Sequence, residues 1–306
     1  MATVGVAGVG RIGTVLVGRL VEAGHHVVAT DIRAERRDDV VTSGAQWARD
    51  VATVAASCPV VFTVLPGSPE LRELVLGDSD FLSTMEDGAV WIDMTSASVE
   101  LGQQCARVAE VHGVAYLDAP IGGGVAAMRD GTVTLHVGGD LVVLQANAPI
   151  LRAFASTVHH VGGPGMGYLN KLLINLMWFG HSVLTSEALL LAQHHGQAPG
   201  RTRELLLGSA GDSAYVRQHL PALLAGDYLR DFGLDRCVEE LDSVERTAGR
   251  AHLPHPLTSV IAEVHRLALQ RFGAVDGELM ATAWLEEQAG TELRRNSPLR
   301  KKNQRD

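Results

Sequence analysis

The sequence predicts an α/β doubly wound parallel sheet followed by an all-α domain, with a long interdomain helix joining the two. Up to about residue 162, short apolar runs typical of buried strands alternate with helical patterns, which is the order of a mainly parallel sheet. A glycine-rich turn at 162–167 ends this alternation, and every periodic stretch beyond it is helical. We therefore expect domains at residues 1–164 and 165–293, followed by a basic tail at 294–306.

The expected elements follow the chain in order. Strands are predicted at residues 3–9, 27–30, 60–65, 89–92, 114–117, 133–137 and 158–161, with a first helix at 11–23. The close spacing of the last strands leaves the topology of that sheet edge open. In the second part, helices are predicted at residues 168–195, 201–207, 216–224, 234–248, 257–270 and 277–288, the first of them ending at Gly196.

Composition and charge limit the possible partners. The chain is 46% hydrophobic and 20% charged, as in ordinary soluble globular proteins. A net charge of −9 gives no body-wide basic surface for nucleic acid. The longest apolar stretch, 172–184, is too short and too often interrupted by polar residues to span a bilayer. Three widely spaced cysteines without a CxxC pair indicate reduced thiols, so we expect a cytoplasmic protein. The basic tail is read as a solvated end, with contact to an anionic partner left open.

A dinucleotide site is predicted at the first strand-to-helix turn. The turn has the pattern G-x-G-x-x-G in the context of a Rossmann domain, and its residues are Gly8, Val9, Gly10, Arg11, Ile12 and Gly13. Its glycines allow a tight turn, approach of a pyrophosphate and close packing of the helix. Asp31 ends the second strand, where a carboxylate can bind the adenosine ribose hydroxyls. That charge favours NAD, while Arg33, Arg36 and Arg37 leave NADP possible.

Lysine usage singles out one residue for chemistry. The chain has only three lysines, and Lys301 and Lys302 lie in the basic tail. Lys171 is therefore the only lysine in the predicted folded body. Arginine stays protonated in proteins, whereas a lysine can exchange a proton. If the segment after Gly167 is helical, Lys171 and Asn175 share one face, which would place a proton donor beside an amide that can orient a substrate.

Several motifs together resemble the β-hydroxyacid dehydrogenase family, which includes 3-hydroxyisobutyrate dehydrogenase and tartronate semialdehyde reductase. In chain order they are GVGRIG at 8–13, VLP at 64–66, IDMTS at 92–96, DAPIGGG at 118–124 and GPGMGYLNKLLIN at 163–175. The resemblance, with a second domain like that of 6-phosphogluconate dehydrogenase, implies interconversion of a 3-hydroxy acid and its carbonyl form. It implies a nicotinamide cofactor, no metal, and a homodimer or homotetramer built through the helical domain.

The same resemblance assigns roles to individual residues. Lys171 becomes the general acid/base, and Asn175 orients the substrate. The remaining positions are the glycines that bind the acid group of the substrate (Gly122, Gly123 and Gly124) and the residues that line the cofactor cleft (Leu65, Pro66, Thr95 and Ser96).

Two departures from the family pattern bear on the substrate. Gly122 stands where the family usually has a serine, and Glu239-Glu240 stands where it has a Lys-Asp pair. A cation expected near the substrate is thus replaced by a carboxylate at Glu239. We hypothesise an atypical substrate, one that bears an amine or lacks the usual carboxylate. The alternative is that the helix is shifted and Glu239 faces solvent.

Two other functions are compatible with a Rossmann domain followed by a helical domain. Imine reductases share the architecture but typically carry aspartate or tyrosine in place of the lysine, so Lys171 favours the dehydrogenase. A non-catalytic dinucleotide-binding protein is the third possibility, and the retained lysine counts against it. The thirteen histidines include no metal-ligand pattern such as H-E-x-x-H, so no metal site is predicted.

Overall fold

The computed structural model describes residues 1–295 and divides into two compact units, which are described separately. The first runs from Met1 to Leu172 and the second begins at Leu173. The expected domain boundary at 164/165 falls in the turn before the helix that contains this division. Of the basic tail expected at 294–306, only Arg294 and Arg295 are among the described residues. The rest of that expectation lies outside them.

The first unit is built on one eight-stranded sheet with the order β3-β2-β1-β4-β5-β6-β7-β8. The strands are β1 (Thr3–Ala7), β2 (His26–Thr30), β3 (Gln46–Trp47), β4 (Val60–Thr63), β5 (Val90–Asp93), β6 (Ala115–Asp118), β7 (Val133–Gly139) and β8 (Ala155–Gly162). All neighbouring strands are parallel except β6 and β7, which are antiparallel. The predicted doubly wound sheet is confirmed, and the edge whose topology was left open is the irregular one. Only β3 was missed, because two residues carry no periodicity.

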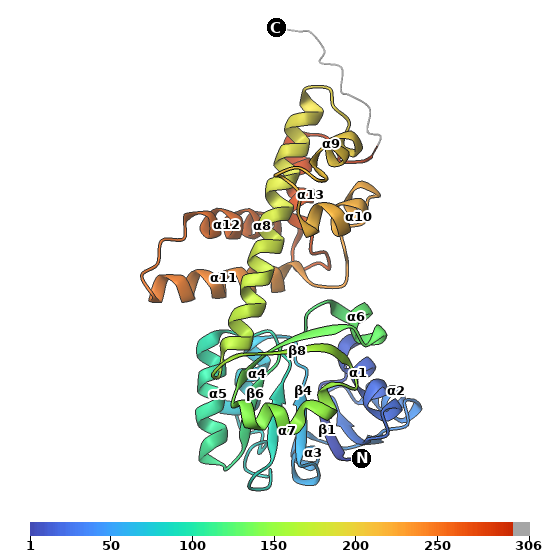
Figure 1. Ribbon diagram of the computed structural model, residues 1–306, viewed down its shortest axis with the longest axis vertical. Coiled ribbons are helices and arrows are strands. Elements are labelled where there is room, and N and C mark those ends of the chain that lie inside the picture. Colours follow the sequence, from blue (N-terminus) through green and yellow to red (C-terminus); the bar gives the residue numbers. More distant parts are fainter. Residues whose placement is uncertain (296–306) are drawn as a thin grey trace. The chain divides into compact units, whose positions relative to one another are not determined.

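Helices cover both faces of this sheet (Figure 1). They are α1 (Arg11–Glu22), α2 (Arg37–Thr42), α3 (Val51–Ser57), α4 (Ser68–Leu76), α5 (Val99–Val111), α6 (Gly124–Asp130) and α7 (Leu141–Leu151), with a short 3-10 turn at Ala34–Arg36. Helices α1, α6 and α7 pack their apolar residues on one face, and α3, α4 and α5 pack on the other. The second face also buries Tyr168, at the start of the next helix.

Helix α8 (Met166–His194) is long enough to run from the first unit into the second. The second unit then contains α9 (Pro199–Leu206), a π-helical turn (Tyr215–His219), α10 (Leu220–Leu224), α11 (Leu234–Arg250), α12 (Pro256–Phe272) and α13 (Met280–Ala289). These match the predicted all-α domain. No helix within residues 1–295 combines the length and apolarity needed to cross a membrane.

One predicted helix begins later than its periodicity suggests. The pattern favoured a start at Gly277, but α13 begins at Met280. The backbone N–H groups of Gly277, Glu278 and Leu279 instead donate to carbonyls in the 228–232 loop. These bonds between distant segments hold residues 277–279 outside the helix, and local sequence does not report them.

The sheet register brings the loops of the predicted site to a single edge. Ala7 pairs with Thr30 and Thr63, Thr63 pairs with Asp93, and Asp93 pairs with Asp118. This row forms the carboxyl ends of five parallel strands. In open α/β sheets the ligand binds beyond this edge, at the point where the strand order reverses. Here that point lies between β1 and β4.

Candidate cofactor and active site

The glycine turn after β1 has the geometry that a dinucleotide site requires. Gly8 has φ +96°, and a Cβ there would lie 2.3 Å from the Val64 carbonyl oxygen. A Cβ on Gly13 would lie 2.0 Å from the Gly8 carbonyl oxygen, so this glycine allows α1 to pack on the turn. A Cβ on Gly10 would meet only the Arg33 guanidinium, at 3.8 Å. Gly10 therefore leaves open space at the N-terminus of α1, where the N–H groups and the helix dipole favour an anion. A nicotinamide dinucleotide fits this arrangement.

Asp31 is held against the turn and is already paired with an arginine. Its Oδ2 accepts a hydrogen bond from the Val9 N–H at 2.7 Å, and its Oδ1 accepts from the Arg33 N–H and Nε at 2.9 Å each. Burial works against ionisation of Asp31, but the hydrogen bonds from Arg33 and Val9 outweigh it and hold the pKa below its usual range. Asp31 is thus a carboxylate at neutral pH. Ile32, the next residue, is fully exposed.

The residues predicted to line the cofactor cleft follow β4 and β5. Leu65 is half-buried and Pro66 exposed, whereas Thr95 is buried and Ser96 half-buried. The Leu65 N–H donates to Thr95 Oγ1 at 3.2 Å, so the two loops are joined directly. Thr95 Oγ1 in turn donates to Asp93 Oδ1 at 2.7 Å.

Asp93 is a buried carboxylate to which the sequence reasoning gave no role. It is fully buried at the end of β5 and accepts hydrogen bonds from the hydroxyls of Thr63, Thr95 and Tyr168. Burial raises the pKa of Asp93 to about 6, against the hydrogen bonds from these hydroxyls, which favour the charged form. The feature of the sequence that could have indicated a role for Asp93 is an acid placed at the carboxyl end of an otherwise apolar strand.

The glycines at 122–124 form the turn between β6 and α6. Gly123 and Gly124 have φ +90° and +66°, a region that favours glycine. Gly122 has no such constraint, and a Cβ there would meet only the Thr134 carbonyl oxygen, at 3.4 Å. The backbone can therefore hold the serine that the family pattern has at this position, so the glycine is not required by the fold.

Lys171 lies in the second turn of α8, and a second buried acid binds the start of that helix. Asp118 Oδ1 accepts from the Gly165 N–H at 2.7 Å, and its Oδ2 accepts from the Tyr168 N–H at 3.0 Å. Burial raises the pKa of Asp118, and these backbone N–H groups oppose the rise. A carboxylate at a helix N-terminus satisfies donors that the helix leaves unpaired. The position of Lys171 is thus tied to the end of β6.

Asn175 follows Lys171 by one turn of α8, as predicted, and its contacts were not foreseen. Within the second unit its Nδ2 donates to Glu240 Oε2. Glu240 is buried on α11, whereas the neighbouring Glu239 pairs with Arg236 at 2.9 Å and is about a quarter exposed. The residue that accepts from Asn175 Nδ2 is therefore Glu240. Sequence reasoning matched both to the family's Lys-Asp pair and chose the one that had changed charge.

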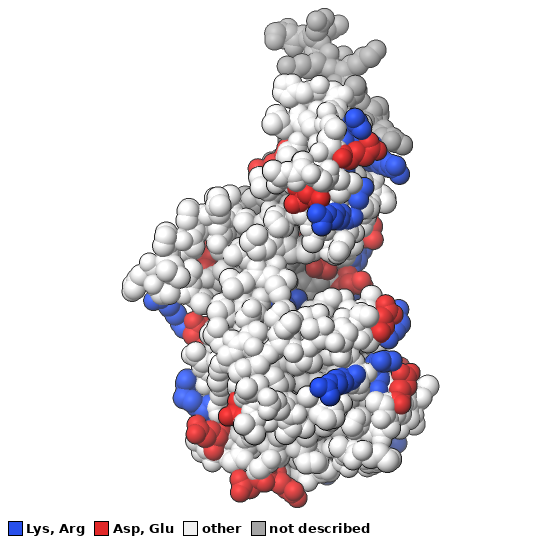
Figure 2. Space-filling view, viewed as in Figure 1, with Lys and Arg blue, Asp and Glu red and all other residues white. Residues whose placement is uncertain are grey.

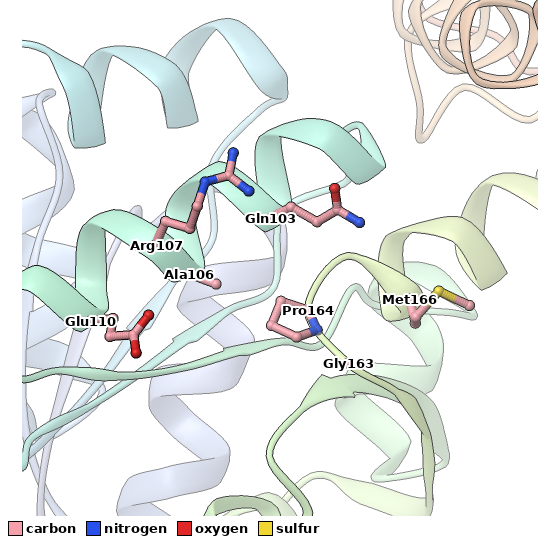
Figure 3. Close-up of a pocket in the computed structure, with 7 residues that line it drawn as sticks. All are labelled: Gln103, Ala106, Arg107, Glu110, Gly163, Pro164 and Met166. Atoms are coloured by element: carbon pink, nitrogen blue, oxygen red, sulfur yellow. The ribbon is translucent and has the colours of Figure 1, made fainter. Parts of the chain in front are cut away.

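A separate hollow of about 460 Å³ lies beside the turn that precedes α8 (Figure 3). It is lined by Gln103, Ala106, Arg107 and Glu110 of α5 and by Gly163, Pro164 and Met166. None of the predicted site residues lines it. On the face drawn in Figure 2, basic and acidic side chains are interspersed and do not form a patch of one sign. The described residues contain no cluster of three or more potential metal ligands.

Comparison with known protein families covers nearly the whole chain. Residues 3–162 match the NAD binding domain of 6-phosphogluconate dehydrogenase. Residues 165–284 match the NAD-binding model of NADP-dependent 3-hydroxyisobutyrate dehydrogenase. Both matches agree with the resemblance inferred from the motifs.

Individual relatives are distant but match along most of their length. The 2-(hydroxymethyl)glutarate dehydrogenase of Eubacterium barkeri is 28% identical over 85% of this chain and 87% of its own. The 2-hydroxy-3-oxopropionate reductase of Escherichia coli is 27% identical over 85% and 89%.

Solved structures give the same architecture. A Mycobacterium tuberculosis 3-hydroxyisobutyrate dehydrogenase, in a structure with L-serine, has a TM-score of 0.84 at 24% identity and covers 92% of this chain and 99% of its own. Imine reductases share the fold less closely, with TM-scores of 0.58 to 0.63 at 18–20% identity. At these identities the likenesses show the fold alone, and the family follows from the two domain matches. The chain belongs to the β-hydroxyacid dehydrogenase family, whose members are oxidoreductases that use NAD or NADP.

Proposed function

We propose that this protein interconverts a 3-hydroxy acid, or a related hydroxy compound that bears an amine, and the corresponding carbonyl compound. The observation that carries the proposal is Lys171, which is the only lysine among residues 1–300. It lies one turn after a helix start that the buried Asp118 binds. Membership of a family of dehydrogenases supports the reaction class.

The proposed chemistry assigns the proton to Lys171. A bound nicotinamide cofactor supplies the hydride acceptor for oxidation and the hydride donor for reduction. In oxidation, Lys171 Nζ would take the hydroxyl proton as the carbinol C–H bond breaks and its hydrogen leaves with the bonding electron pair as hydride. In reduction, the same group returns a proton to the developing alkoxide oxygen. General acid/base assistance of this kind is worth about 10²–10⁴ in rate. Asn175 is proposed to orient the substrate from the same helix face.

NAD is the proposed preferred cofactor. The open space at Gly10 and the N-terminus of α1 would hold the pyrophosphate. The Asp31 carboxylate would accept from the ribose hydroxyls and repel a 2′-phosphate. The Arg33 guanidinium, bound against Asp31, lessens that repulsion and keeps NADP use possible.

An amine-bearing substrate is the finer part of the proposal. The serine expected to contact a substrate carboxylate is replaced by Gly122, and a lysine by Glu239. Both changes weaken recognition of a simple anionic hydroxy acid. In the second unit Glu240 adds a buried carboxylate against Asn175. The structure of the Mycobacterium tuberculosis 3-hydroxyisobutyrate dehydrogenase with L-serine is consistent with amine-bearing ligands in this fold.

The deciding experiment follows nicotinamide absorbance for wild type, Lys171→Met and Lys171→Arg. The panel contains 3-hydroxy acids, their amino-substituted analogues, and cyclic imines with reduced cofactor. We expect turnover of a hydroxy compound by wild type and a loss of about 10²–10⁴ in kcat in both variants. Lys171→Arg keeps the charge but cannot exchange the proton, so it separates acid/base chemistry from electrostatic attraction.

Cofactor affinity, measured by nicotinamide fluorescence, is the control and should stay unchanged in both variants. A Lys171→Met enzyme with wild-type turnover would remove Lys171 from the mechanism. Reduction of cyclic imines alone would replace the assignment by C=N reduction. Tight cofactor binding without turnover of any panel compound would support a non-catalytic dinucleotide-binding protein.

The proposed assembly is a homodimer or homotetramer that forms through the helical unit. Four exposed apolar residues recur on α8 at spacings of four and seven, namely Leu173, Met177, Leu184 and Leu191. Such spacing keeps side chains on one helix face. Glu187 is the only acidic residue of α8, and the helix surface in Figure 2 is largely uncharged. The proposed partner of this apolar face of α8 is the same face on a second copy of the chain. The proposed location is the cytoplasm, in agreement with three buried free thiols.

A further inference from the structure

Three chains of hydrogen bonds end on the carboxylate of Asp93. Through the first chain, the Trp91 indole N–H donates to Thr63 Oγ1 at 2.8 Å, and Thr63 donates to Asp93. Through the second, the Leu65 N–H reaches Asp93 by way of Thr95. Through the third, the hydroxyls of Tyr116 and Tyr168 lie 2.8 Å apart, and Tyr168 donates to Asp93.

Proton counting fixes the direction of every bond in this network. Each hydroxyl has one proton, and Thr63, Thr95 and Tyr168 all use theirs on Asp93. The Tyr116 hydroxyl must then donate to Tyr168. Only a group that accepts from all sides can occupy the centre, and an ionised carboxylate does so. An asparagine would turn an NH₂ group toward at least one of these donors. Polar groups this deeply buried are costly when left unsatisfied, so the arrangement holds its members in one geometry.

Three members of the network come from segments of the proposed site. Leu65 and Thr95 belong to the loops after β4 and β5 that are predicted to line the cofactor cleft. Tyr168 belongs to the first turn of α8 and precedes Lys171 by three residues. Residues three apart in a helix are neighbours on its surface, so the position of Tyr168 sets that of Lys171.

The Tyr168 ring has little room to move if its hydroxyl is kept. A Cβ on Gly102 of α5 would lie 2.8 Å from the ring, and a Cβ on Gly167 would lie 2.5 Å from the carbonyl oxygens of Asp118 and His136. The helix start is therefore packed directly on α5, on the end of β6 and on the middle of β7. Packing limits the translation of this turn, and the hydroxyl bond to Asp93 supplies a directional link to the cofactor loops.

We propose that Asp93 and Tyr168 are positioning residues. Asp93 is linked to the loop at Leu65 through Thr95 and to the first turn of α8 through Tyr168. These links fix the loop and the helix start relative to each other and so place Lys171 for proton transfer. This inference rests on the proposed role of Lys171 as general acid/base. Neither residue needs to touch the substrate. A displacement of about 1 Å in a reacting group can cost about 10²-fold in rate, so loss of the link should appear in kcat.

Two matched variants test the link. Tyr168→Phe removes the hydroxyl that donates to Asp93, whereas Tyr116→Phe removes an equally buried hydroxyl that does not contact Asp93. We expect Tyr168→Phe to lower kcat by about 10- to 100-fold with little change in the KM for cofactor. Tyr116→Phe should stay within about threefold of wild type. Equal losses in the two variants would overturn the proposal, because both lose one buried polar group and only one loses the link.

A double-mutant cycle with Lys171→Met separates positioning from a general structural effect. If Tyr168 acts through Lys171, Tyr168→Phe should cause no further loss in the Lys171→Met background. A full additional loss there would overturn the positioning role while leaving the acid/base role intact. Wild-type turnover by Lys171→Met alone would instead reject the proposed function.

A spectroscopic measurement tests the link without any substrate. With ¹³C-lysine labelling the chain yields signals from only three lysines, and Lys171→Arg identifies the one from Lys171. We expect that signal to shift or broaden in Tyr168→Phe and to stay unchanged in Tyr116→Phe. An unchanged Lys171 signal in Tyr168→Phe would overturn the proposal. Should Tyr168→Phe fail to fold, Thr95→Val removes a donor to Asp93 from the loop side, with the same signal as the readout.

Discussion

At the scale of single residues, the glycines of the first turn separate a folding requirement from a binding requirement. A Cβ on Gly13 would lie 2.0 Å from a backbone oxygen, whereas a Cβ on Gly10 would meet only a flexible guanidinium at 3.8 Å. The motif alone predicts both glycines and does not distinguish their roles. Packing decides that Gly13 serves the fold, and open space indicates that Gly10 serves the ligand.

The Gly10→Ala and Gly13→Ala variants should therefore fail in different ways. Gly10→Ala should unfold at the wild-type temperature but bind NADH at least about tenfold more weakly, a change of about 1.4 kcal/mol, because its methyl group occupies the proposed pyrophosphate position. Gly13→Ala should lose about 1–3 kcal/mol of stability or more through overpacking. Thermal denaturation and NADH fluorescence titration check both. Strong NADH binding by a stable Gly10→Ala protein would contradict the assignment of the turn.

We propose that a residue pair also decides cofactor choice. Asp31 and Arg33 neutralise each other through three hydrogen bonds that involve the Arg33 side chain and backbone. We expect Asp31→Ser to release the guanidinium and raise kcat/KM for NADPH relative to NADH by at least about tenfold. The control is Arg33→Ser with Asp31 intact, which should lower any residual NADPH use. If the ratio is unchanged in Asp31→Ser, Asp31 does not select the cofactor.

At the scale of elements, the order of strands and helices was predictable because each follows local periodicity. Strands β1, β4, β5 and β6 are apolar runs buried on both faces, and α8 ends where Gly196 was expected to stop it. The network that joins these elements was not predictable. Thr63 and Tyr168 lie 30 and 75 residues from Asp93 along the chain, and no local pattern indicates which hydroxyl meets which carboxylate.

The end of β5 should give stability a measurable pH dependence. The pKa of Asp93 is about 6 in the folded chain, against an ordinary value of 3.8. The folded state therefore binds the Asp93 proton more tightly than the unfolded state does. The stabilisation that this proton gives to the fold is fully present below about pH 3.8 and is lost as pH rises through about 6. The difference between these two pKa values corresponds to about 3 kcal/mol of unfolding free energy. About half of that stabilisation is lost between pH 5 and 7.5.

Urea denaturation of wild type and Asp93→Asn at pH 5 and 7.5 measures this effect. The unfolding free energy of wild type minus that of Asp93→Asn should be about 1.5 kcal/mol larger at pH 5 than at pH 7.5. The neighbouring Tyr116, Tyr168 and Cys105 have pKa values raised by burial and stay neutral throughout this range. Asp118 is present in both proteins, so its contribution cancels to first order. A pH-independent difference would mean that Asp93 titrates outside this range.

At the scale of the whole molecule, the apolar face of α8 predicts assembly. Leu184 is 66% exposed on that face, and Leu205, which belongs to α9 and not to α8, is 51% exposed. Burying one leucine contributes about 1.5–3 kcal/mol, and a twofold interface uses each position twice. We expect wild type to be a dimer or tetramer by light scattering. Leu184→Glu should weaken association by at least about 10²-fold, and the control Leu205→Glu should not. Assembly unaffected by Leu184→Glu would exclude this face as the interface.

Local sequence was sufficient to predict the doubly wound sheet, the helical second unit and the dinucleotide turn, and to single out Lys171 as the only lysine among residues 1–300. These depend on local periodicity, glycine spacing and residue choice, all of which are read along the chain. The tertiary structure shows that Arg33 binds Asp31, that Asn175 donates to Glu240, and that three donor chains converge on Asp93. The physical reason is that a hydrogen bond between distant residues depends on strand register and helix packing, which bring its partners together only after the chain has folded.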